Sequence, residues 1–343
     1  MGIEILVAVV LLGIGIALIV KGGDFFVDAA SWFAEISGIP KLIVGATVVS
    51  FATTLPELLV SAFAAFEARA TGDADLVDMA IGNAVGSVTA NLGLIFAIAL
   101  IAMPTVIRRK DYLLKMILML GASAAVVGFS LLFEGIELFS SIVLLAIFAV
   151  AMFDNIREAV VTVKAEKAAN VGNPDNQKEK ATRRTVIVNI VKFVLGAAGI
   201  VFGADLLVDN ASALASLCGV SDRVISVTIV AIGTSLPELV TTLTAIVKKQ
   251  ASLSAGNIIG ANIIDLTLIL PVCAVISGGT LPVVGTVGVL DMPACLIIGA
   301  VACIPTIFTK KFARWQGILL LGLYAVYMTL TVFFGDAVLA LVQ

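Results

Sequence analysis

Ten long apolar runs, separated by short polar breaks, dominate the sequence. They lie near residues 3–20, 42–66, 79–103, 112–132, 137–153, 185–207, 224–247, 252–277, 288–306 and 316–339. Each is close to the ~20 residues that an α-helix needs to cross a bilayer, whereas outer-membrane strands use ~10 residues of alternating pattern. Only 13% of the residues are charged, compared with about a quarter in a soluble domain. The pattern predicts an all-α polytopic membrane protein with ten transmembrane helices.

The composition excludes several kinds of chemistry. The chain has no histidine, which removes imidazole bases, histidine-ligated metals and histidine proton relays. The four cysteines are scattered in apolar surroundings without C-x-x-C spacing, which favours packing over metal or redox roles. We therefore expect no cofactor and no nucleic-acid partner. The spans leave no room for a soluble domain, so function must reside among helices surrounded by membrane lipid.

The basic residues predict the orientation. With the N-terminus outside, the inside segments hold 17 of the 21 lysines and arginines. Short cytoplasmic loops are enriched in these residues, so we expect both termini outside the cell membrane. The first run lacks a basic leader and a small-residue cleavage site, which predicts a retained helix rather than a signal peptide.

An internal repeat relates two halves of the chain. A shift of 181 positions aligns residues 22–60 with 203–241 without a gap, so that T-T-L-P-E at 53–57 meets T-S-L-P-E at 234–238. At a shift of 174, G-N-A-V-G-S at 82–87 meets G-N-I-I-G-A at 256–261. We divide the chain into a five-helix repeat at 1–154, a polar cytosolic linker at 155–184 and a second five-helix repeat at 185–343. An odd number of spans in each half inverts the second copy, a recurring plan of secondary transporters.

Two glutamates stand at equivalent positions deep in the membrane. Glu57 lies about fifteen residues into its span, ~22 Å from the inner surface, and Glu238 is its counterpart. A carboxylate at this depth costs at least ~2.5–3.5 kcal/mol on insertion scales, so it requires a cation, a proton or a polar cavity. Hydroxyl groups lie one helical turn before each glutamate, at Thr53 and Thr54 in the first copy and at Thr234 and Ser235 in the second.

Further oxygen atoms come from the next span and from the backbone. Ser87 and Asn91 lie one turn apart in the first copy, and Ala261 and Asp265 occupy the same positions in the second. Pro56 and Pro237 lack an N–H, so each leaves a carbonyl of the preceding turn without its usual partner. Asn83 and Asn257 are expected to form hydrogen bonds between helices rather than to bind ions. The pairs Asp24/Asp28 and Asp205/Asp209 are expected to be solvated at the membrane surface, with Lys21 as a partner in the first copy; a cation-collecting vestibule is the alternative.

The charge of these groups indicates what they bind. Glu57, Glu238 and Asp265 form a site of charge −3 lined by hydroxyls and amides, which favours Ca²⁺ or Na⁺ over transition metals. One divalent ion with a proton, or several monovalent ions, would neutralise the site, but both sets together would not fit its charge. This exclusion provides a physical basis for exchange. Crowded carboxylates also bind protons, so we expect protons to compete with calcium.

At these residues the sequence resembles the cation/Ca²⁺ antiporter superfamily, specifically the prokaryotic Na⁺/Ca²⁺ exchanger type. The resemblance rests on the paired motifs G-(T/S)-(T/S)-x-P-E and G-N-x-x-G-(S/A) and covers both halves. It implies alternating access in which the long first and sixth helices slide past a fixed core. The cation ligands that it implies are Thr53, Thr54, Glu57, Ser87, Asn91, Thr234, Ser235, Glu238 and Asp265.

The chain departs from the family pattern at two positions. Ala52 replaces a glycine in the first motif, and Ala261 replaces a serine ligand of what resembles a sodium site. A Ca²⁺/H⁺ exchanger or a K⁺-dependent Na⁺/Ca²⁺ exchanger of the same superfamily remains an alternative to Na⁺/Ca²⁺ exchange. Two hypotheses from other classes are an intramembrane hydrolase, which would need paired aspartates or an activated serine, and a channel.

Overall fold

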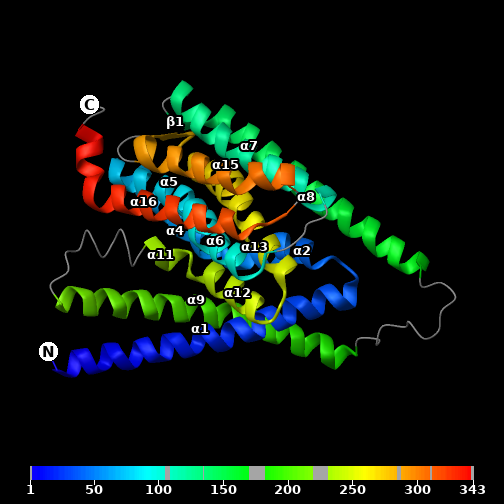
Figure 1. Ribbon diagram of the computed structural model, residues 1–343. Coiled ribbons are helices and arrows are strands. Elements are labelled where there is room, and N and C mark those ends of the chain that lie inside the picture. The colour runs from blue at the N-terminus through cyan, green and yellow to red at the C-terminus, as the bar shows by residue number, and fades with distance from the viewer. Residues whose placement is uncertain are drawn as a thin grey trace.

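The computed structural model describes residues 2–104, 109–133, 135–169, 182–218, 231–283, 287–309 and 311–340. Helices make up nearly all of this part of the chain (Figure 1). The first half contains α1 (Gly2–Ser37), α2 (Lys41–Val44), the π-helical η1 (Gly45–Val49), α3 (Ser50–Thr53), α4 (Leu55–Thr71), α5 (Ala74–Ala90), the π-helical η2 (Asn91–Phe96), α6 (Ala97–Ala102), α7 (Arg109–Phe133) and α8 (Leu138–Ala169).

The second half repeats this order. It contains α9 (Arg183–Leu217), α11 (Ala231–Thr234), α12 (Leu236–Val247), α13 (Ala251–Ile264), η5 (Asp265–Ile269), α14 (Leu270–Ile276), η6 (Val287–Asp291), α15 (Met292–Thr309) and α16 (Arg314–Ala340), where η5 and η6 are π-helical. The all-α expectation needs one small addition. Strands β1 (Gly135–Glu137) and β2 (Thr280–Pro282) pair antiparallel, with Ile136 opposite Leu281, and join the connections that follow α7 and α14.

The membrane-crossing helices agree with the predicted spans as far as the structure describes them. Eight described helices are long and apolar enough to cross a bilayer, and the bent pair Lys41–Thr53 and Leu55–Thr71 makes a ninth. The predicted span 224–247 begins outside the described residues, and its remainder forms α11 and α12. Helix α1 begins and α16 ends at the same end of the molecule (Figure 1), as an even number of crossings requires.

Two predicted boundaries are corrected by the helices themselves. The span predicted at 3–20 is too short, because α1 continues without a break through Lys21, Asp24 and Asp28 to Ser37. Its 36 residues would extend ~54 Å, well beyond the ~30 Å hydrocarbon layer, so the helix must tilt or protrude. Helix α8 likewise continues to Ala169, into the segment predicted as the linker, of which residues 170–181 lie outside the described part.

Helices α1 and α9 form an antiparallel pair along one side of the molecule (Figure 1). A Cβ atom added to Gly22 would lie 2.8 Å from the carbonyl oxygen of Gly196, and one added to Gly15 would lie 2.9 Å from that of Gly203. The 181-residue shift places Gly15 on Gly196 and Gly22 on Gly203, so the two contacts are equivalent in the repeat. The repeat thus produces a two-fold related interface in which the two backbones touch.

The centre of the molecule is formed by two other equivalent segments. The segment Ala251–Ile276 spans α13, η5 and α14, and 83% of its most apolar 18-residue stretch is buried. The segment Leu76–Ala102 spans α5, η2 and α6, and 72% of the corresponding stretch is buried. The corresponding value for α1 and for α9 is 22%. A helix that is buried on all sides has a core position, so α1 and α9 are peripheral and these two segments hold the core.

An ion-pair cluster attaches α1 to the core. The ammonium group of Lys248, directly after α12, lies 3.2 Å from Asp24 and 2.7 Å from Asp28 of α1. The expected partner Lys21 is therefore replaced by a lysine from the second half of the chain. In the repeat, Glu67 occupies the position equivalent to Lys248, so an acidic residue stands where the first cluster has its lysine.

The glycine contacts lead to a test of the α1–α9 interface. We expect Gly22→Ala to lower the melting temperature by several degrees, since overpacking costs about 1–3 kcal/mol. Gly13→Ala is the matched control in the same helix, because its Cβ would meet nothing within 4 Å among the described residues. Thermal unfolding in detergent followed by intrinsic fluorescence measures both variants. Equal melting temperatures for the two variants would contradict the close approach.

Candidate cation site

Breaks in two transmembrane helices position the glutamates. The first break lies at Thr54, where the axis bends by 45° between Lys41–Thr53 and Leu55–Thr71. The second lies at Ser235, between α11 and α12. Pro56 and Pro237 are each the second residue of the helix that follows the break, where a missing N–H has no cost. Glu57 and Glu238 therefore stand in the first turn of α4 and α12, where the helix dipole favours negative charge.

The two glutamate side chains meet inside the protein. Each is 1% exposed, and their carboxyl groups lie close enough to interact directly and with Asp265. The hydroxyl of Thr54 donates to Oε1 of Glu238 at 3.3 Å, which joins the two repeats. Within the described residues, Oε2 of each glutamate has no hydrogen-bond partner. Two unpartnered carboxylate oxygens thus lie in the same interior region.

Asn91 and Asp265 stand at equivalent irregularities of the core helices. Each is the first residue of a π-helical segment, η2 and η5 respectively, and such bulges occur frequently at functional sites. Each side chain is 1% exposed. Neither carboxylate oxygen of Asp265 nor Oδ1 of Asn91 has a partner within the described part of the chain. Four carboxylate oxygens and one amide oxygen are therefore free to bind a cation.

The remaining predicted ligands lie in the same region. Ser235 donates to Oγ of Ser87 at 3.5 Å, and Thr53 donates to the carbonyl oxygen of Ser50 at 3.3 Å. The predicted ligands Thr53, Ser87 and Ser235 are each at most 3% exposed. The repeat equates Ser87 with Ala261, which is fully buried and supplies no side-chain oxygen. The second repeat consequently supplies one side-chain hydroxyl fewer than the first.

Thr234 is the predicted ligand with the most open surroundings. It is partly buried and lines a cavity of about 170 Å³ between α9, α4 and the broken helix α11–α12. Pro56 and Pro237 border the same cavity, and so do Asp205 and Asp209 of α9. The second acidic pair therefore lies beside the site residues, whereas the first pair is engaged by Lys248.

The carboxylates alone do not make a complete metal site. Within the described residues, no three Asp, Glu, Cys or His side chains come together in the geometry of a metal centre. Hydroxyl, amide and backbone oxygens would have to complete the coordination, which suits hard cations such as Ca²⁺ and Na⁺. The nine predicted residues come from α3, α4, α5, η2, α11, α12 and η5 and the two helix breaks.

Asn262 is a site residue that the sequence analysis missed. Its Oδ1 accepts a hydrogen bond from Nδ2 of Asn91 at 3.1 Å, and it is completely buried. Because the amide nitrogen of Asn91 is held in this way, Oδ1 of Asn91 is left for another partner. The repeat gave no signal for this residue, since Val88 occupies the equivalent position in the first copy.

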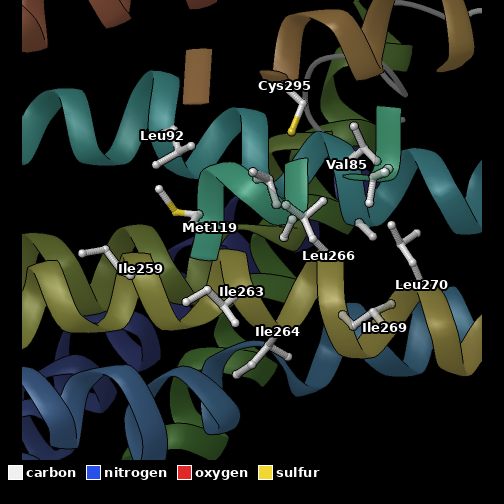
Figure 2. Packing of buried hydrophobic residues seen from close by; sticks show 14 of the residues in the cluster. Val85, Leu92, Met119, Ile259, Ile263, Ile264, Leu266, Ile269, Leu270 and Cys295 are labelled. Carbon is white, nitrogen blue, oxygen red and sulfur yellow. The ribbon is translucent and has the colours of Figure 1, made fainter. Parts of the chain in front are cut away.

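An apolar shell encloses the polar groups. Figure 2 shows buried Ile263, Ile264, Leu266 and Ile269, which lie close to Asp265 in the sequence of α13 and η5, together with Met119 and Cys295 from neighbouring helices. Low-dielectric surroundings strengthen interactions between charges and penalise an uncompensated carboxylate. The site therefore combines three acidic groups with surroundings that do not solvate them.

Comparison with known proteins identifies the family. The model of the sodium/calcium exchanger protein family matches residues 7–156 and 188–333, one segment in each predicted half. The chain belongs to the sodium/calcium exchanger family. It is a secondary transporter and not an enzyme, which removes the intramembrane hydrolase hypothesis.

Individual relatives match over nearly the whole chain. The chain is 29% identical to the sodium/calcium exchanger MaX1 of Methanosarcina acetivorans, covering 92% of this chain and 95% of the relative. It is 31% identical to the inner membrane protein YrbG of Escherichia coli, covering 95% and 97%. The crystal structure of the sodium-calcium exchanger NCX_Mj soaked with 10 mM Na⁺ and zero Ca²⁺ matches with a TM-score of 0.77 and 27% identity, covering 95% of this chain and 99% of that one.

The crowded carboxylates predict a calcium-dependent change in stability. We expect Ca²⁺ to raise the melting temperature of the wild type, because a ligand that binds only the folded state stabilises it. Asp265→Asn should raise stability without calcium by removing repulsion, and should reduce the calcium-induced increase. Thermal unfolding with and without Ca²⁺ measures both effects, with exposed Glu67→Gln as the control. An unchanged calcium response in Asp265→Asn would exclude that residue from the site.

Proposed function

We propose that the protein exchanges Ca²⁺ for Na⁺ across the cell membrane by alternating access at one midplane site. The three buried carboxylates of Glu57, Glu238 and Asp265 carry the proposal, because their unpartnered oxygens lie at the breaks and bulges of core helices. Broken helices and irregular backbone at mid-membrane are typical of the ion sites of secondary transporters. The nine predicted residues would form the ligand set.

The charge of the site supports exchange rather than co-transport. One Ca²⁺ compensates two of the three carboxylates, and a proton or a further ion compensates the third. Several Na⁺ ions compensate the same charge, so occupancy by one set excludes the other. A site that binds both sets in turn, and opens to one side at a time, couples their movements in opposite directions.

The cavity beside Thr234 borders the candidate site and would give it a route to one surface. With both termini outside, as the distribution of basic residues favours, α9 runs outward and the cavity lies on the outer side of the glutamates. Asp205 and Asp209 would attract cations to this route. On the inner side, Lys248 joins α1 to the end of α12. The cavity position supports access to the site from the outer side in the described state.

Removal of either glutamate charge should abolish exchange. We expect Glu57→Gln and Glu238→Gln each to lower calcium uptake into sodium-loaded proteoliposomes by at least tenfold, because a neutral amide does not compensate Ca²⁺. Uptake of radioactive calcium measures the effect, and Glu67→Gln on the surface of α4 is the control. Undiminished uptake in either site variant would remove that glutamate from the ligand set.

The coupling ion is tested by changing the gradient. We expect an outward Na⁺ gradient to drive calcium uptake without potassium, and an outward proton gradient at constant Na⁺ to fail. Uptake should decrease as the medium is made mildly acidic, since protons compete for the carboxylates. Proton-driven uptake would favour a Ca²⁺/H⁺ exchanger, and an absolute requirement for K⁺ would favour a K⁺-dependent exchanger. A large, non-saturating calcium current without sodium would favour a channel.

A further inference from the structure

Asn83 and Asn257 are equivalent in the repeat but have different hydrogen-bond partners. Asn83 donates through Nδ2 to the carbonyl oxygen of Glu57 at 3.1 Å and to Oγ of Ser61 at 2.9 Å. These bonds join α5 to α4 within the first repeat. Asn257 instead accepts a hydrogen bond from Thr53 at 3.3 Å, which joins the second repeat to the first. One asparagine therefore binds within its repeat and the other binds across the two repeats.

The second repeat also contains the partners for the bond that Asn257 does not make. Thr242 is the counterpart of Ser61, and the carbonyl group of Glu238 is the counterpart of that of Glu57. Both Thr242 and Asn257 are completely buried. Yet Oγ1 of Thr242 and Nδ2 of Asn257 have no hydrogen-bond partner within the described residues. A buried polar group without a partner is uncommon and costs stability. These two groups are the counterparts of Ser61 and Asn83, which bond to each other in the first repeat, so their lack of partners requires an explanation.

We propose that the two asparagines exchange these roles when the transporter changes its access state. In the opposite state, Asn257 donates to the carbonyl group of Glu238 and to Thr242, while Asn83 releases Ser61 and bonds to Thr234, the counterpart of Thr53. The proposal rests on the alternating access proposed above, because inverted repeats that exchange conformations also exchange their contacts.

The exchange would make the two states similar in energy. One bond within a repeat breaks as its equivalent forms, so the number of hydrogen bonds stays the same. Asn83 and Asn257 then act as positioning residues for the helices that carry the glutamates, without touching the ions. The unpartnered Thr242 hydroxyl in this structure is the acceptor that the other state uses.

Two conservative variants should shift the equilibrium in opposite directions. Ser61→Ala removes an acceptor used in the present state, and Thr242→Val removes one used only in the opposite state. The readout is the labelling of Val208→Cys, which lines the cavity beside Thr234, by a membrane-impermeant maleimide in a background without native cysteines. Ser61→Ala should decrease the labelling rate and Thr242→Val should increase it, because the loss of one hydrogen bond, ~1 kcal/mol, changes the equilibrium constant between the two states about fivefold.

Control variants separate this exchange from a general loss of packing. Thr241→Val removes a neighbouring hydroxyl that is also buried and unpartnered, but its counterpart in the repeat is Val60, so labelling should not change. The double variant Ser61→Ala/Thr242→Val should restore the wild-type labelling rate, because each state loses one bond. Shifts in the same direction, or no rescue in the double variant, would overturn the proposal.

Labelling requires no ion gradient, so it distinguishes this proposal from the proposed function. Opposite shifts without any calcium uptake in the wild type would support the exchange of the asparagines and reject calcium exchange. Normal sodium-driven calcium uptake together with unchanged labelling in both variants would reject only the role of the asparagines.

Discussion

Burial of three carboxyl groups in an apolar helix bundle is the constraint on which the structure depends. Glu57, Glu238 and Asp265 are each 1% exposed, and lipid-facing helices separate them from bulk water. Such groups persist only where polar atoms or cations compensate them. The helix breaks at Thr54 and Ser235, the π-helical segments at Asn91 and Asp265 and the shell of hydroxyls all supply polar atoms at this depth.

Duplication of one sequence motif provides the two halves of this environment. Each repeat contributes one broken helix with a glutamate in its first new turn and one bulged core helix with a polar residue at the bulge. The antiparallel arrangement of α1 and α9 (Figure 1) supports inverted copies, in which the helix N-termini would approach the acidic groups from both sides and direct their dipoles toward them. The differences between copies, such as Ala261 opposite Ser87 and Lys248 opposite Glu67, are then the places where the two halves have become specialised.

The repeat determined how much of the site could be predicted from sequence. Residues present in both copies, such as Glu57 and Glu238, stood out because the motif occurs twice at a depth that the sequence predicts to be near mid-membrane. Asn262 was missed because Val88 replaces it in the first copy. The contact of Lys248 with Asp24 and Asp28 joins residues more than two hundred positions apart, which no local pattern reveals. Helix α1 was predicted too short because the charged residues Lys21, Asp24 and Asp28 within the helix look like the end of a span.

The glycine contacts of α1 distinguish its interface with α9, where backbones touch, from its interface with α12, where side chains lie between the helices. At Gly22 and Gly196 the two backbones touch, so relative displacement of these helices would force main-chain atoms past one another. At Gly23 the neighbours across the interface with α12 are the side chains of Thr244 and Val240, which can change rotamer. In the proposed alternating access, the two long helices would therefore move together, and the side-chain layer between them and the core would be the sliding surface.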